Sequence, residues 1–275
     1  MSIARDRLLL EMGIGPLWKL RHVPVDAVVV PAAPAPTPAA APAAVLAAPR
    51  TTVAPTQPIP AQAPAPPTDV AVDQQAQRRA AIAQMDWPAL KAAVGTCAAC
   101  TLCSSRKNTV FGVGDESAQW MLVGEAPGAE EDARGDPFVG QAGQLLDAML
   151  AALDMRRGQN VYIANVLKCR PPGNRNPAPE EVARCAPHLL RQVALIKPKL
   201  ILLMGRFAAQ TLLASDASIA SLRGRLHSFA GTPAIVTYHP AYLLRAPTDK
   251  ARAWEDLLLA RATWRSLQTA GDATT

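Results

Sequence analysis

Short, almost wholly apolar runs alternate with longer amphipathic stretches from about residue 120 to the end of the chain. Each apolar run has the length of a buried strand, and we expect strands over residues 120–123, 161–167, 198–204 and 234–238. Helical spacing of apolar residues predicts helices over about residues 77–94, 141–153, 179–196, 206–214 and 249–268. Buried strands that alternate with helices indicate a sheet covered on both faces. The pattern therefore predicts an α/β fold, a three-layer sandwich around a central, mainly parallel four-stranded sheet.

The loop after the first expected strand has the most distinctive composition in the chain. Residues 122–140 read LVGEAPGAEEDARGDPFVG, an apolar run that ends in a glycine-rich, acidic loop ahead of the next helix. By itself this could be an ordinary strand-to-helix connection. In open α/β folds, however, ligands bind outside the carboxyl ends of the strands. The residues expected at those ends, and so around one crevice, are Glu125, Asn165, Gly205 and His239.

The first part of the chain has a different character. Of the 26 prolines, 12 fall between Pro31 and Pro67, in a stretch with almost no charge that cannot bury enough apolar surface to fold. We interpret residues 23–80 as a disordered Pro/Ala-rich linker and residues 1–22 as a short N-terminal helical element. That element is expected either to bind a protein partner or to be an unstructured or self-docking tail. The folded domain is expected over residues 81–270, followed by a tail at 271–275.

Charge and hydropathy limit the kind of partner and the cellular location that the protein is expected to have. The formal net charge of +6 and the pI of about 9.3 suit an anionic partner, although charge alone is weak support. No apolar run approaches the roughly 20 residues that a membrane-spanning helix needs. An acidic residue, Glu11, and the later residues 18–21 do not fit a signal peptide. We therefore expect a cytoplasmic monomer that does not enter the membrane.

Five cysteines in such a protein suggest thiols or metal ligands rather than disulfides. Cys97 and Cys100 have C-x2-C spacing, whereas Cys169 and Cys185 flank a proline-rich loop. Four thiolates can bind zinc or hold an iron–sulfur cluster, and the spacing does not choose between them. A metal centre would stabilise that loop, which is a structural role. Cys103 is the spare, expected to be a free or shielded thiol.

Several long motifs, taken together and in order, resemble one known family. They are Cys97-x2-Cys100, GEAPGAEED at 124–132, PFVGQAGQLLD at 137–147, NVLKCRPPGNR at 165–175, Cys185, and HPAYLLR at 239–245. This set is similar to the family 4 uracil-DNA glycosylases of bacteria and archaea, over about residues 84–268. The resemblance implies a [4Fe-4S] cluster on Cys97, Cys100, Cys169 and Cys185. It also implies removal of uracil from DNA, with uracil-containing DNA as the partner and a nucleoid-associated location.

A glycosylase takes its target base out of the stack and reads it in a closed pocket. By resemblance, Phe138 stacks on the flipped uracil, and Asn165 distinguishes uracil from cytosine through its amide. His239 donates a hydrogen bond to uracil O2 and so stabilises the departing anion, as an oxyanion hole does. The expected catalytic residues are thus Glu125, Asn165 and His239. Each also has a plain structural alternative, as a helix cap or a satisfied core residue.

The nucleophilic water is the hardest step to assign. Other glycosylase families place an aspartate in the first motif, where this chain has Ala126. Among Glu125, Glu131 and Asp132, we favour Glu125 for water or charge stabilisation and assign Glu131 to shaping the pocket near uracil C5. Those carboxylates could instead only cap the next helix. The expected uracil-binding residues are Gly124, Ala126, Gly128, Glu131, Phe138, Asn165 and His239.

Residues 239–245 resemble a loop that enters the duplex. Leu243 or Leu244 would fill the gap left by the flipped base, and Arg245 would meet a phosphate. Further phosphate contacts are expected from Lys168, Arg170 and Arg175.

Two other functions compete with a monofunctional glycosylase: a catalytically inactive DNA-binding or scaffold protein on the same fold, and an unrelated four-cysteine zinc protein. A related branch cross-links to DNA through a histidine in a long basic insertion. Residues 165–185 contain neither that histidine nor that insertion, so excision with turnover is expected.

Overall fold

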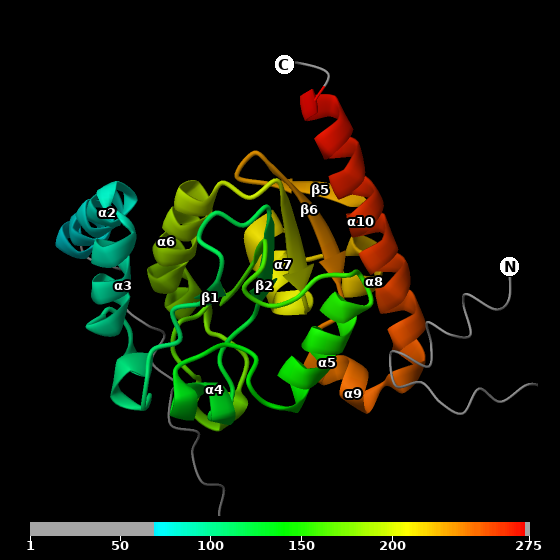
Figure 1. Ribbon diagram of the computed structural model, residues 1–275. Coiled ribbons are helices and arrows are strands. Elements are labelled where there is room, and N and C mark those ends of the chain that lie inside the picture. Colours follow the sequence, from blue (N-terminus) through cyan, green and yellow to red (C-terminus); the bar gives the residue numbers. More distant parts are fainter. Residues whose placement is uncertain (1–68, 273–275) are drawn as a thin grey trace, which may run out of the picture. The chain divides into compact units, whose positions relative to one another are not determined.

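A computed structural model of the chain describes residues 69–272 (Figure 1). The predicted N-terminal element at 1–22, most of the predicted linker and the last residues of the predicted tail lie outside the described residues. Their predictions therefore stay predictions.

The core of the fold is a sheet with strand order β1-β3-β2-β4-β6-β5. Strands β3, β2, β4 and β6 run parallel, and β1 and β5 pair antiparallel at the two edges. The strand bounds are Val113–Gly114 for β1, Trp120–Gly124 for β2, Val161–Asn165 for β3, Leu200–Met204 for β4, Leu226–Phe229 for β5 and Thr232–Thr237 for β6. The four predicted strands are confirmed. The predicted number of strands is wrong, because the sheet has six.

The two extra strands carry no continuous apolar run. β1 is only two residues long, and β5 alternates exposed and half-buried residues along its length. Both lie at edges, where one side of the strand has no neighbour to bury it. A search for buried runs therefore cannot find them.

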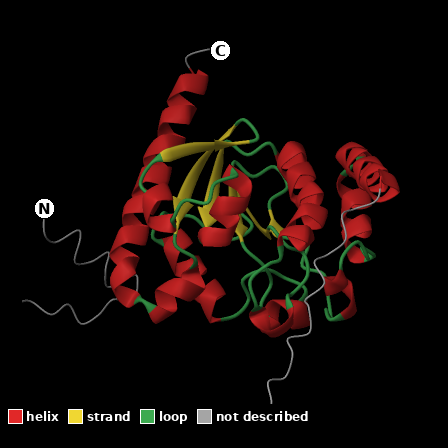
Figure 2. Cartoon of the chain, turned by 180° about the vertical axis from the view of Figure 1, so that it is seen from behind, coloured by secondary structure: helices red, strands yellow, loops and turns green. Residues whose placement is uncertain are grey.

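Helices cover both faces of the sheet, as Figures 1 and 2 show from opposite sides. Alternate residues of β2 point to opposite faces: Trp120 and Leu122 pack with α5 and α10, while Met121 and Val123 pack with α6 and α7. The three-layer α/β prediction is confirmed. The helix bounds are Asp69–Gln84 (α2), Trp87–Gly95 (α3), Ala129–Arg134 (α4), Gln141–Ala151 (α5), Pro179–Ile196 (α6), Arg206–Leu213 (α7), Ile219–Leu222 (α8), Pro240–Arg245 (α9) and Lys250–Asp272 (α10), with 3-10 turns at Thr101–Ser104 (η2), Pro172–Asn174 (η3) and Pro247–Asp249 (η4).

The helix predicted over 77–94 is two helices, α2 and α3, separated at Met85 and Asp86. Asp86 caps α3, because its Oδ1 accepts a hydrogen bond of 2.9 Å from the Ala89 N–H. α2 begins at Asp69, earlier than the predicted helix start at about residue 77 and inside the stretch predicted as linker. Residues 69–80 contain no proline and many good helix formers, a local change that averaging over the longer stretch conceals. Within residues 69–272, no helix is both long and apolar enough to span a bilayer.

The register of the parallel strands brings their carboxyl ends together. Gly124 of β2 pairs with Asn165 of β3, and Met204 of β4 pairs with Thr237 of β6. The pairing of β2 with β4 aligns Val123 with Leu203. The residues that follow these strands therefore emerge side by side at one edge of the sheet.

Candidate active site

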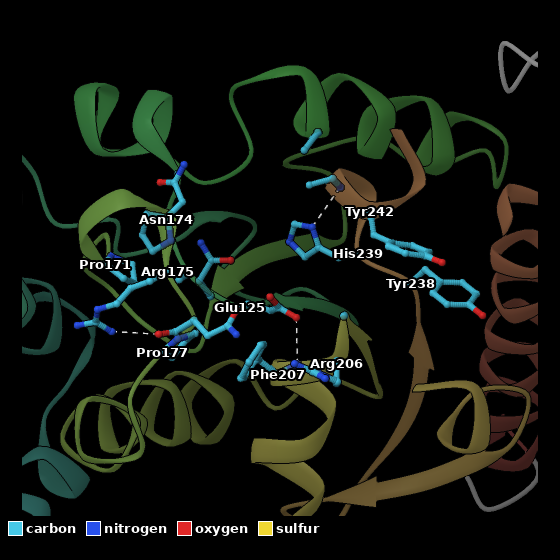
Figure 3. A pocket seen from close by; sticks show the side chains of 18 of the residues that line it. Glu125, Pro171, Asn174, Arg175, Pro177, Arg206, Phe207, Tyr238, His239 and Tyr242 are labelled. Carbon is cyan, nitrogen blue, oxygen red and sulfur yellow. Dashed lines mark hydrogen bonds between the residues drawn. The ribbon is translucent and has the colours of Figure 1, made fainter. Parts of the chain in front are cut away.

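A cavity of about 770 Å³ opens at the carboxyl edge of the parallel strands. Its wall is built from the segments that follow β2, β3, β4 and β6, so Glu125, Asn165, Gly205 and His239 all line it. Figure 3 labels Glu125 and His239 among the side chains around this cavity. The predicted crevice is confirmed. The predicted uracil-binding residues Ala126, Gly128, Glu131 and Phe138 line the same cavity.

Asn165 is the last residue of β3 and is only 2% exposed. Its Oδ1 has no hydrogen-bond partner among the described residues, although buried polar atoms are normally paired. Gly124 makes room for this amide, because a Cβ there would lie 2.4 Å from Asn165 Oδ1 and 2.6 Å from Phe138 Cζ. Gly124 does not line the cavity itself. It lets the side chains that do so approach β2.

Phe138 lies in the loop before α5, with a left-handed φ of 55°. Its ring stacks against the His239 ring at a centroid distance of 5.4 Å and an interplanar angle of 28°. The Arg157 guanidinium donates to the carbonyls of Pro137 and Phe138, each at 2.9 Å, and pairs with Asp147 at 2.9 Å. The backbone that carries the Phe138 ring is thus held in place by Arg157. Sequence reasoning missed Arg157, which lies about 20 residues from the loop it holds.

The carbonyl of Phe138 also lies against α5. A Cβ on Gly143 would be 1.8 Å from the Phe138 oxygen, so only glycine fits at that position of α5. Gly143 of the motif at 137–147 is therefore required for the packing of α5 against the Phe138 carbonyl.

His239 caps the N-terminus of α9, and its Nδ1 accepts a hydrogen bond of 3.1 Å from the Ala241 N–H. Burial, assisted by the charge of Arg245, lowers the pKa of His239 to about 4, against the opposing effect of Glu131. The ring is therefore neutral at pH 7. Because Nδ1 is the acceptor, the single ring proton is on Nε2, and His239 presents an N–H donor.

Glu125 follows β2 and reaches the first turn of α7, where its Oε1 accepts a hydrogen bond of 3.0 Å from the Phe207 N–H (Figure 3). Burial raises the pKa of the Glu125 carboxyl, although the Phe207 N–H and the charge of Arg206 act in the opposite direction. Gly205 permits this arrangement. It has φ +97°, and a Cβ there would lie 2.5 Å from Glu125 Oε1 and 3.0 Å from His239 Cβ.

The other two acidic candidates organise the loop. Glu131 accepts hydrogen bonds from the N–H groups of Gly128, Val139 and Gly140 at 3.1, 2.9 and 3.3 Å. Asp132 is buried, and its Oδ1 accepts from the N–H groups of Lys107 and Asn108 at 2.9 and 3.3 Å. Glu131 thus shapes the cavity wall, whereas Asp132 does not line the cavity.

Burial contradicts one predicted DNA contact, Lys168, and decides between the alternatives Leu243 and Leu244. Lys168 is 1% exposed, and its ammonium donates to Asn165 O and Gln192 Oε1 inside the protein, so it cannot meet a phosphate. Leu243 is fully buried in the core between the sheet and α10, whereas its neighbour Leu244 is 41% exposed. Leu244 is therefore the residue of the pair that can reach a duplex.

The predicted arginines are placed differently. Arg245 is exposed and lines the cavity. Arg170 donates to Asn174 Oδ1 at 2.8 Å, and Arg175 pairs with Glu181 at 2.5 Å while also lining the cavity. Sequence reasoning missed Arg206, which lines the cavity beside Gly205, although its position directly after a strand end was the available signal.

The four predicted metal ligands come together. Cys97, Cys100, Cys169 and Cys185 line one small internal cavity, and Cys103 does not. Three sulfur atoms accept hydrogen bonds: Cys97 from Arg78 at 3.5 Å, Cys169 from Arg106 at 3.2 Å and Cys185 from the Lys168 backbone N–H at 3.3 Å. Within residues 69–272, no three Cys, His, Asp or Glu side chains are grouped closely enough to hold a single metal ion.

Burial also sets the chemistry of these thiols. It raises the pKa of the Cys185 thiol to about 12, while the neighbouring Lys168 acts to lower it. The thiol therefore keeps its proton at neutral pH unless a metal displaces it, since thiolate is the ligating form.

Comparisons with known proteins agree with this geometry. Residues 111–258 match the model of the uracil DNA glycosylase superfamily. The chain is 45% identical over 160 residues to the type-4 uracil-DNA glycosylase of Archaeoglobus fulgidus, which covers 55% of this chain and 80% of the relative. It is 41% identical over 183 residues to that of Pyrobaculum aerophilum (64% and 93%), and 44% identical over 161 residues to that of Thermotoga maritima (58% and 83%). The chain therefore belongs to the uracil DNA glycosylase superfamily and, within it, to the type-4 uracil-DNA glycosylases.

Proposed function

We infer that the protein is a monofunctional uracil-DNA glycosylase that flips uracil out of DNA, hydrolyses its N-glycosidic bond and leaves an abasic site for base excision repair. The observation that carries this function is the buried, unpartnered Oδ1 of Asn165 in a cavity bounded by the stacked rings of Phe138 and His239. A buried acceptor that has no partner among residues 69–272 is suited to a ligand that brings an N–H group.

Uracil has the edge that this amide fits. Asn165 Oδ1 accepts from uracil N3–H while Nδ2 donates to uracil O4. Cytosine presents an acceptor at N3 and a donor at C4, the reverse of this pattern. Each buried polar group left unpaired by the wrong base costs about 1–3 kcal/mol. A mismatch at both positions is therefore enough for strong discrimination.

Cleavage of the glycosidic bond leaves negative charge on the departing uracil. The neutral His239 donates from Nε2 to uracil O2, where that charge gathers. Such a donor is worth roughly 2.7–4 kcal/mol of transition-state stabilisation. The low pKa of His239 suits this role, because the ring donates a hydrogen bond without having to lose its proton to the product.

The opposite charge develops on the sugar. The Glu125 carboxylate is the acidic group best placed to stabilise it and to orient the attacking water, since Oε1 is held by Phe207 N–H and Oε2 is left for water. Ala126 has no carboxylate to share this work. Glu125 therefore takes the place of the aspartate that the first motif has in other glycosylase families.

The duplex is held by residues around the rim of the cavity. Leu244 fills the space vacated by the flipped base, and Arg245, Arg170 and Arg175 contact phosphates. Leu244 lies next to Arg245 at the end of α9, the same short helix that His239 caps. Insertion into the duplex and contact with the flipped base are thus tied to one rigid element.

The four cysteines are proposed to hold a [4Fe-4S] cluster, which when bound stabilises the fold around residues 169–185. The thiolate set fits, because four cysteines line one cavity and three of their sulfurs already accept hydrogen bonds. The arrangement favours a cluster over a single zinc ion, which needs all its ligands at one point. Iron content and visible absorbance of the purified protein distinguish the two.

An excision assay tests the function. A labelled oligonucleotide with one uracil, as U:G, U:A or single strand, is incubated with the protein and then treated with alkali. Strand cleavage at the uracil only after alkali is expected, with no cleavage of the matched thymine oligonucleotide. Tight binding without cleavage in all three contexts would instead establish the inactive DNA-binding protein, and a heat-stable adduct would establish cross-linking.

A further inference from the structure

Lys168 is the most unusual buried residue outside the catalytic set. Its side chain is among the largest fully buried ones, at 1% exposure. Within the part of the chain that the structure describes, no carboxylate pairs with its ammonium group. A buried charge without compensation is costly, and a methionine would fill the same space without that cost. We therefore expect the buried ammonium to have a role that offsets the cost of burying it.

One side of Lys168 faces the base-reading residue. The ammonium donates to the backbone carbonyl of Asn165 at 2.9 Å and to Gln192 Oε1 at 2.7 Å. Gln192 is itself fixed, because its Nε2 donates to Phe111 O at 2.9 Å and to Tyr162 Oη at 3.2 Å. The carbonyl of Asn165 is thus fastened, through the side chains of Lys168 and Gln192, to α6, to the Phe111 carbonyl and to Tyr162 of β3.

The other side of Lys168 faces the cysteines. Lys168 lines the cavity formed by Cys97, Cys100, Cys169 and Cys185. Its backbone N–H donates to Cys185 Sγ at 3.3 Å. Four thiolates around one centre carry negative charge, which is the compensation that no carboxylate supplies.

We propose that Lys168 is a positioning residue that joins the cysteine centre to uracil recognition. Its ammonium is the counter-charge of the thiolates and, by the same placement, the donor that orients the Asn165 peptide so that the amide meets the uracil edge. This inference rests on the proposed function, since it names how the base-reading residue is held.

The first test replaces Lys168 with methionine, which has similar length but neither charge nor donor. Excision is measured under single-turnover conditions on a U:G duplex. Loss of a buried hydrogen bond from a charged group predicts at least a tenfold drop in kcat/KM. The matched control is Lys91→Met on α3, an exposed lysine that lines neither the substrate cavity nor the cysteine cavity, and it should leave excision unchanged. An unchanged kcat/KM in Lys168→Met would overturn the proposal.

A double-mutant cycle separates positioning from general damage. If Lys168 acts through Asn165, Lys168→Met should have little further effect in an Asn165→Ala background, because the side chain being oriented is gone. Additive losses would overturn the proposal. Lys168→Gln, which is uncharged but keeps a donor, serves as the second variant if Lys168→Met does not fold, and it is judged by the same cycle.

The proposed link between Lys168 and the four cysteines is tested by a separate measurement, the rate of iron loss. Wild type and Lys168→Met are exposed to an iron chelator, and visible absorbance follows the loss of iron. The variant should lose iron at least threefold faster than wild type and than Lys91→Met, and equal rates would refute the counter-charge role. This measurement needs no DNA. If wild type itself excises no uracil, the proposed function fails, whereas the link between Lys168 and the cysteines is still tested.

Discussion

Gly205→Ala is the substitution whose effect follows most directly from the geometry of the site. The new Cβ would lie 2.5 Å from Glu125 Oε1 and 3.0 Å from His239 Cβ. Carbon and oxygen atoms in ordinary van der Waals contact are at least 3.4 Å apart, so the carboxylate must move by about 1 Å to restore such a contact. The backbone at φ +97° adds strain for any residue with a side chain.

The two effects have different magnitudes and different readouts. Gly205 has φ +97° and ψ +166°, a backbone conformation that is essentially restricted to glycine and costs any other residue about 1–3 kcal/mol of stability. A misplacement of about 1 Å in a catalytic group lowers the rate by roughly a hundredfold. We therefore expect kcat to fall by about two orders of magnitude. KM should change much less, because the three atoms nearest to the new methyl group belong to Glu125 and His239, not to Asn165 or Phe138, which hold the base.

The assay compares Gly205→Ala with Gly231→Ala in single-turnover excision of uracil, together with thermal unfolding. Gly231 has φ +79°, but a Cβ there meets no atom within 4 Å. Gly231→Ala therefore carries the backbone strain without the clash. Its melting temperature should fall while its excision rate stays at the wild-type level. A Gly205→Ala rate within threefold of wild type, or an equal loss in Gly231→Ala, would refute the reasoning.

Three further predictions concern other parts of the site. Arg157→Met removes both donors that hold the Phe138 loop and should raise KM about tenfold with little change in kcat; steady-state kinetics with an unchanged KM would contradict this. Because burial raises the pKa of Glu125 and the carboxylate is the active form, excision should fall with decreasing pH, beginning above the range of an ordinary glutamate. Glu125→Gln should lower kcat and abolish this acid limb, and a pH–rate profile that retains the limb would exclude Glu125 as its source. Leu244→Ala should weaken excision from duplex DNA more than from single strands, whereas Leu226→Ala, another exposed leucine, on β5, should change neither; equal losses on both substrates would refute insertion.

The central strands of the fold can be predicted from the sequence, because buried parallel strands consist of continuous apolar runs. The edge strands β1 and β5 cannot be predicted in this way. Within the described residues, each pairs with another strand on one side only, and neither contains a continuous buried run. The start of α2 was missed for a related reason. Composition averaged over a long proline-rich stretch conceals the proline-free helix at its end.

The site residues at the ends of strands could be predicted from the sequence. The residues whose roles depend on whether the side chain is buried could not. Lys168 and Arg175 read alike in the sequence, as basic residues of one loop, yet Lys168 is buried and Arg175 is exposed. Leu243 and Leu244 are neighbours, and only the packing of α9 against the core decides which one faces outward. The role of Gly205 depends on contacts with Glu125 and His239, which are far away in the sequence.

The identity of the base released is the measurement that tests uracil reading by Asn165 most directly. Duplexes that carry uracil, cytosine or thymine opposite guanine are incubated with wild type and with Asn165→Asp, and the free bases are separated and quantified. Wild type should release uracil, one molecule for each abasic site, and neither of the other bases, while Asn165→Asp should release uracil much more slowly. Release of no base by wild type, or of cytosine at a rate similar to uracil, would contradict the proposed reading of the site.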